Sequence, residues 1–154
     1  MSALRIVMAS FSTALVLAVC ALSAAQPAAA KSGQVTVDIV GFKSDRGRAF
    51  VALYRGPDGF PNKPNKAFAR KIVSIRERRV RVVFDAVPAG ELAVSMIHDE
   101  NGNDEFDTNF VGIPKEGWGT SRDAKAGFGP PSYADAVLKL AAGERKRIVV
   151  HVQY

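Results

Sequence analysis

Hydrophobic and polar residues alternate along most of the chain after residue 31. The segment QVTVDIV (34–40) places Val35, Val37 and Ile39 on one face of a strand and polar residues on the other. The same period of two recurs in residues 48–54, 71–76, 79–84, 91–98, 133–140 and 146–154. Turn residues separate most of these segments, and none shows the 3.6-residue period of an amphipathic helix. The pattern predicts an all-β fold, a single antiparallel β-sandwich of about seven strands.

Two connections interrupt the alternation. Residues 56–68 are rich in proline and glycine and are expected to form a loop. Residues 99–132 form a much longer connection without a strand or helix pattern, and such loops are usually functional or disordered. Disorder fits poorly, because the segment and its flank contain many apolar residues: Phe106, Phe110, Val111, Ile113, Trp118, Phe128 and Tyr133. We therefore expect one long loop that forms a compact cap over one end of the sandwich.

The first thirty residues have the composition of a secretory signal peptide. Arg5 precedes an uncharged apolar run, and the small residues SAAQPAAA (23–30) allow cleavage after Ala25 or Ala30. A membrane anchor is the alternative, but the run is rich in Ala and Ser and lacks a basic flank. Cys20 follows Val19, which is a poor fit to lipid attachment. We predict a signal peptide at 1–30, one β-sandwich domain at 31–154 without a transmembrane helix, and a periplasmic or secreted location.

The charge of the mature chain bears on its partners. The whole chain has 21 Lys and Arg and 15 Asp and Glu, so removal of Arg5 with the signal leaves a net charge of +5. Nucleic acid is not an expected partner outside the cytoplasm, whereas an anionic envelope component, a glycan or a protein is. A basic cluster is either a solvated surface or a contact for phosphate-bearing lipids or polysaccharide; its members are Arg70, Lys71, Arg76, Arg78, Arg79 and Arg81.

The segment HDENGNDEFDTN (98–109) concentrates oxygen-bearing side chains. Counted from Asp99, positions 1, 3, 5, 7 and 9 are Asp99, Asn101, Asn103, Glu105 and Asp107. This is the spacing at which the start of an EF-hand loop supplies oxygens to Ca²⁺, with a backbone carbonyl at position 7. Five negative charges within residues 99–107 would also repel one another without a cation.

Two departures from the EF-hand pattern keep an alternative open. Position 6 is Asp104 instead of glycine, and position 12 is Phe110 instead of a bidentate glutamate. Glu116 is the nearest candidate for the missing carboxylate. The alternative is that the Asp and Asn side chains only stabilise turns, because both residue types form Asx-turns and tolerate left-handed backbone. Another metal is a third possibility.

The histidines and serines do not indicate catalysis. His98 shares the inward parity of Met96 and is expected to be a hydrogen-bonded residue at the edge of the core, while His151 has outward parity. The chain has no nucleophile elbow and no phosphate-binding glycine loop, so we predict that it is not an enzyme. A glycan-active enzyme using Glu105 with Asp107, or Glu116 with Asp123, is a less favoured alternative.

The segments ALYRGPDGFP (52–61) and HDENGNDEFDTNFVGIPKEGWGTSRDAKAGFGPPSYADAVLKL (98–140) resemble the DUF2141 family of small exported bacterial proteins. The resemblance implies a transthyretin-like or immunoglobulin-like β-sandwich and no established activity. Asp104 and TSRD (120–123) depart from the family pattern. Two functions remain open: an envelope accessory or binding module, favoured if Trp118, Phe128 and Tyr133 are exposed together, and a purely structural domain.

Overall fold

The structure is a computed structural model that describes residues 31–111, 114–127 and 129–154. The predicted signal peptide therefore lies outside the described residues, as do Ile113 and Phe128. The described chain consists mainly of β-strands arranged in two sheets, which confirms the all-β prediction. No helix in these ranges is long and apolar enough to cross a membrane.

The three-stranded sheet has the order β4 (Arg79–Val87), β1 (Gly33–Val40), β8 (Arg145–His151). Strand β1 pairs antiparallel with β4 but parallel with β8. The prediction of a wholly antiparallel arrangement is therefore wrong for one pair. Parallel neighbours need a long connection between them, and here nearly the whole domain separates β1 from β8 in sequence.

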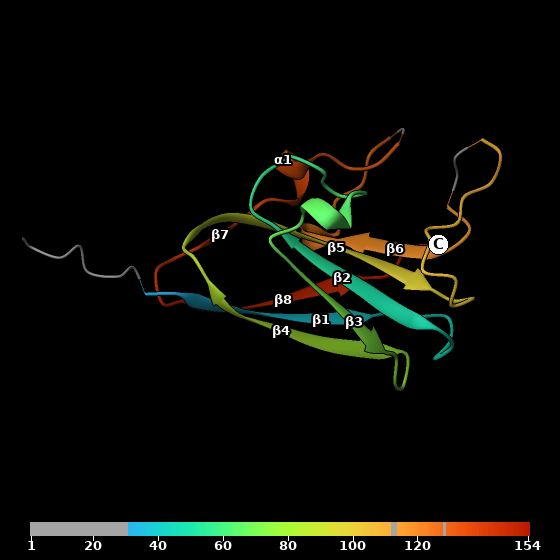
Figure 1. Cartoon of the computed structure of the whole chain (residues 1–154), viewed down its shortest axis with the longest axis horizontal. Helices are drawn as coiled ribbons and strands as arrows, with labels where there is room; N and C mark the ends of the chain where they lie inside the picture. Colours follow the sequence, from blue (N-terminus) through green and yellow to red (C-terminus); the bar gives the residue numbers. More distant parts are fainter. Residues whose placement is uncertain (1–30, 112–113, 128) are drawn as a thin grey trace, which may run out of the picture.

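The five-stranded sheet has the order β3 (Ala69–Ser74), β2 (Arg48–Tyr54), β5 (Gly90–Asp99), β6 (Gly117–Thr120), and β7 (Leu138–Leu140) pairs with the start of β5. Its pairings are antiparallel. Short helices η1 (Pro64–Lys66) and α1 (Tyr133–Ala136) lie on the side of this sheet that faces away from β1, β4 and β8 (Figure 1).

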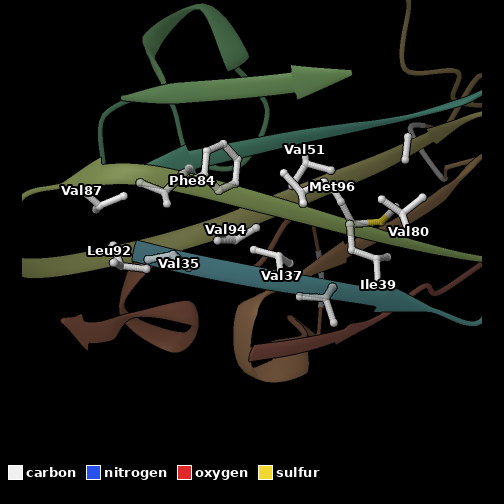
Figure 2. Close-up of a cluster of buried hydrophobic side chains, with 14 of the residues drawn as sticks. Val35, Val37, Ile39, Val51, Val80, Phe84, Val87, Leu92, Val94 and Met96 are labelled. Carbon is white, nitrogen blue, oxygen red and sulfur yellow. The ribbon is translucent and has the colours of Figure 1, made fainter. Parts of the chain in front are cut away.

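Both sheets contribute to one hydrophobic core (Figure 2). The inward positions expected from the alternation are buried on β1, β4 and β5, and Val73 on β3 is half-buried against them. Fully burying one such side chain contributes about 1.5–3 kcal/mol, so these alternating strands supply most of the stabilisation of the domain. The transthyretin-like or immunoglobulin-like type of this arrangement stays a prediction.

Two segments differ from the secondary structure expected from sequence. Residues 133–136 form α1 instead of strand, because the Ser132 hydroxyl accepts a hydrogen bond from the Asp135 backbone and caps the helix. Strand β6 lies within the connection that was expected to contain none. Its sequence GWGT is too short to show alternation, and it forms by pairing with β5. The described chain thus has eight strands instead of about seven.

Candidate functional site

Asp99 organises the start of the acidic loop, which comprises residues 99–107. It ends β5, opposite Arg48 of β2, and is only 1% exposed. Its Oδ1 accepts hydrogen bonds from the backbone N–H groups of Gly102 (2.7 Å) and Asn103 (3.2 Å), and Oδ2 accepts one from Asp104 (3.2 Å). One buried carboxylate therefore folds five residues of chain around itself, as Asp does in Asx-turns.

Glu116 closes the same loop from its far end. The side chain is 4% exposed, and its two carboxylate oxygens accept backbone N–H groups from Glu100 (3.1 Å) and Asp107 (3.2 Å). Hydrogen bonds to an ionised acceptor are roughly twice as strong as neutral ones. The structure thus brings Glu116 to the loop, as expected, and shows that its carboxylate joins the loop's two ends.

The remaining candidate ligands surround Asp107. The amide groups of Asn101 (2.6 Å) and Asn103 (3.3 Å) donate to one oxygen of the Asp107 carboxylate. The amide oxygens of these two residues accept backbone N–H groups from Asn103 and Glu105, both at 2.9 Å. Glu105 itself is exposed at the rim of the loop. The loop is therefore closed by short-range hydrogen bonds.

The geometry bears on the two departures from the EF-hand pattern. Asp104 adopts left-handed backbone with a φ of 65°, so an aspartate provides the conformation that glycine normally provides at position 6. Phe110 is 99% exposed and Val111 is 62% exposed, which makes the expectation of a compact cap wrong for this part of the loop. This loop projects beyond the end of β5 and the start of β6 (Figure 1).

No group of three or more His, Cys, Asp or Glu side chains among the residues that the structure describes is arranged to hold a metal ion. The hydrogen bonds of Asp99, Asn101 and Asn103 are those that the turn-only interpretation expects. Calcium binding by Asp99, Asn101, Asn103, Glu105, Asp107 and Glu116 stays a prediction.

His98 is fully buried beneath this loop. Its Nε2 lies 2.8 Å from the carbonyl oxygen of Arg46, and its Nδ1 lies 2.8 Å from the hydroxyl of Tyr154. A carbonyl only accepts, so we assign the proton to Nε2 and infer that the Tyr154 hydroxyl donates to Nδ1. The same hydroxyl accepts the backbone N–H of Lys43 (2.9 Å). His98 thus holds the C-terminal residue against the base of the loop, in the structural role expected from its parity.

A row of apolar side chains crosses the outer face of the five-stranded sheet. Phe50 on β2 lies opposite Ile72 on β3 and Ile97 on β5, and Ile97 lies opposite Trp118 on β6. Side chains directly opposite one another on adjacent strands are in contact range. None of the four is fully buried, and Ile72 is 50% exposed. The row is therefore an apolar strip open to solvent.

Two loops turn this strip into a groove of about 650 Å³. Pro61, Asn62 and Pro64 line one side, and Asp104, Glu105 and Phe106 of the acidic loop line another. Arg48 fixes the second wall, because its Nη2 atom lies 2.5 Å from Asp104 and 3.6 Å from Asp99. The acidic loop is thus one wall of the groove. The hydrogen bonds of Asp99 and Glu116 therefore also hold this wall in position.

Two of the three aromatic residues that would favour recognition if exposed together, Trp118 and Tyr133, lie in the described part of the chain. Trp118 is half-buried at the end of the apolar row, whereas Tyr133 packs edge-on against Phe60 with ring centroids 5.7 Å apart. Phe128 lies outside the described residues. Sequence reasoning missed Phe50, Ile72 and Ile97, although RAFVALY and KIVSI have apolar residues at both parities, a signal that both faces of β2 and β3 are apolar.

The fold and the groove together define an all-β domain with an apolar, ligand-sized depression on one sheet. The chain belongs to the DUF2141 family, described as uncharacterized protein conserved in bacteria, whose model matches residues 37–148. No curated protein and no solved structure matches the chain.

Proposed function

We propose that this protein is an exported binding module of the bacterial cell envelope that holds an amphiphilic ligand in the groove. The observation that carries the proposal is the row of Phe50, Ile72 and Ile97, which lines the groove between its two walls. Binding pockets are typically concave and mostly apolar with a few polar groups at the rim. Export rests on the signal-peptide pattern of residues 1–30.

Charges at the rim specify the ligand further. Arg70 of β3 lines the groove on the same face as Ile72 and forms no ion pair with any described residue, whereas the Lys71 ammonium lies on the opposite face, 5.9 Å from the centroid of the Phe84 ring. On the other wall, Asp104 is already paired with Arg48, and Glu105 is an exposed carboxylate without an ion-pair partner among the described residues. The unpaired charge near the β3 side of the groove is therefore positive. A ligand with an apolar body and one anionic group satisfies both features.

Binding is favoured over catalysis by the use of the carboxylates. Both oxygens of Glu116 accept backbone hydrogen bonds, and both oxygens of Asp123 accept bonds from His151. Asp107 accepts from two asparagines. These structural partners of Glu116, Asp123 and Asp107 support a binding function over a glycan-active enzyme.

Ile72→Ser should weaken binding of an anionic apolar probe, anilinonaphthalene sulfonate, about fivefold. Ile72 is half exposed at the open side of the row, so its replacement removes apolar contact from the groove at little cost to folding. Covering half of an isoleucine side chain contributes about 1 kcal/mol, and each 1.4 kcal/mol is tenfold in affinity. Energy transfer from Trp118, the single tryptophan of the chain, measures the binding.

Val149→Ser is the matched control. Val149 is also β-branched, lies on an edge strand and is 48% exposed, but it belongs to the three-stranded sheet. Its replacement should leave the probe's dissociation constant within about twofold of the unchanged protein. Equal affinities in Ile72→Ser and the unchanged protein would contradict the groove as the binding site.

Calcium is proposed as a stabiliser of the acidic wall. Adding Ca²⁺ to chelator-treated protein should raise the melting temperature, because a ligand at one hundred times its dissociation constant adds about 2.7 kcal/mol of stability. Asp99→Ala should abolish the rise and Glu100→Ala should retain it, because the Glu100 carboxylate accepts from Ser44 instead of pointing into the loop. An unchanged melting temperature in millimolar calcium would show that Asx-turns alone stabilise the loop.

A further inference from the structure

The outer face of the three-stranded sheet is strongly basic. Its outward positions include four arginines, Arg79 and Arg81 on β4 and Arg145 and Arg147 on β8, against only two aspartates, Asp38 on β1 and Asp85 on β4. Arginines more than sixty residues apart in sequence meet on this face because β1 lies between β4 and β8. Of the six basic residues that cluster in the sequence, only Arg79 and Arg81 lie on β4, and here they are joined by Arg145 and Arg147 of β8.

Asp38 sits between two of these arginines. Arg81 donates from Nε to one oxygen of Asp38 at 2.6 Å, and Arg147 donates from Nε to the other. Although burial alone would raise the pKa of the Asp38 carboxyl, the hydrogen bonds from Arg147 and Arg81 hold it below its ordinary value. Neither bond uses the terminal Nη groups, and the arginine side chains are 64% and 61% exposed. The cluster therefore carries a net positive charge with free donors directed outward.

The other charges on this face do not cancel the excess. Asp85 accepts a hydrogen bond from Gln34, and His151 is paired with Asp123. Arg79 and Arg145 have no ion-pair partner within the described ranges. Valines lie between the arginines, with Val149 48% exposed and Val40 and Val83 half-buried. The surface combines spaced guanidinium groups with exposed apolar side chains.

We propose that the outer face of β4, β1 and β8 docks the protein on an anionic phospholipid membrane surface. The phosphates of such a surface match the outward Nη groups of Arg81 and Arg147, and the valines between them match the apolar boundary below the headgroups. The face is built from three paired strands and is broad, whereas a site for one small anion would need a pocket. It lies on the side of the molecule away from η1 and α1 (Figure 1). Docking would therefore leave the groove accessible.

Vesicle sedimentation tests this proposal. The purified protein should bind vesicles of phosphatidylcholine containing about one third phosphatidylglycerol, and binding should be lost near 1 M salt, where the screening length is about 3 Å. Each arginine near an anionic surface contributes about fivefold in partition, so Arg81→Gln/Arg147→Gln should bind about thirtyfold more weakly. The double variant Arg79→Gln/Arg145→Gln should lose the same vesicle affinity. Because neither of its arginines forms an ion pair in the described chain, this loss would reflect weaker docking and not impaired folding.

Lys63→Gln/Lys115→Gln is the matched control, because it removes the same charge from loops outside the three strands. It should bind the vesicles within about twofold of the unchanged protein. Three results would overturn the proposal. They are an equal loss of vesicle binding in this control variant, equal binding of the unchanged protein to pure phosphatidylcholine vesicles, and binding of the protein to soluble polyglutamate but not to vesicles. Membrane docking is independent of the groove. Ile72→Ser should therefore leave vesicle binding unchanged, and the arginine variants should keep their affinity for anilinonaphthalene sulfonate.

Discussion

His98→Ala should lower the free energy of unfolding by about 3–4 kcal/mol. The imidazole is fully buried, so its removal leaves a cavity in a packed core and forfeits edge-on contacts with Phe42 and Tyr154. It also leaves the carbonyl of Arg46 and the hydroxyl of Tyr154 without their histidine partner. Urea unfolding followed by circular dichroism measures the change.

Two further variants make this result specific. His151→Ala removes the other histidine, whose side chain is 60% exposed, and should change stability by less than about 1 kcal/mol. Tyr154→Phe removes only the hydroxyl and should cost about 1–2 kcal/mol. If His98→Ala and His151→Ala were equally mild, His98 would not hold the C-terminal residue in place.

Asp99→Ala should lower the free energy of unfolding by about 3 kcal/mol in chelator-treated buffer. It removes a buried acceptor of three backbone N–H groups and the contact with Arg48. Hydrogen bonds to charged groups contribute about 1.5–3 kcal/mol each, and part of the loss is offset because the freed N–H groups reach water. Because the loop is a wall of the groove, affinity for the naphthalene probe should fall with it.

Glu105→Ala provides the comparison. Glu105 is a carboxylate of the same loop, but it is exposed and its side chain has no partner in the described chain. Its replacement should change stability by less than about 0.5 kcal/mol. A result in which both variants are equally stable would show that the acidic loop is not organised by Asp99.

The strands were predictable where one face is buried and the other solvated. Strand β1 and the first six residues of β4 alternate between buried and more exposed positions because core contacts select every second residue, whereas β5 is buried on both faces. Strand β6 has only four residues, two of them glycine, so its structure depends on pairing with β5. A Cβ at Gly119 would lie 2.9 Å from the carbonyl oxygen of His151, which explains a glycine that no periodicity requires. The parallel pairing of β1 with β8 is likewise a tertiary outcome.

The loop was more predictable than the groove. The spacing of Asp99 and the nearness of Glu116 in sequence suffice to place both at one loop, because the hydrogen bonds involved are local. Phe50, Ile72 and Ile97 come from three separate strands and become neighbours only through the register of the sheet. An apolar residue at an outward position is ordinarily interpreted as solvent-exposed, so the groove could be recognised only once the strand register was known.

Chemical-shift mapping tests the central claim most directly. Backbone amide resonances of the labelled protein would be followed while anilinonaphthalene sulfonate is added. We expect shifts to concentrate on β2, β3 and β5 around Phe50, Ile72 and Ile97, to extend to the Asp104–Phe106 wall, and to be absent around Val149. Shifts confined to the three-stranded sheet, or no saturable shifts at all, would contradict a ligand-binding groove on this protein.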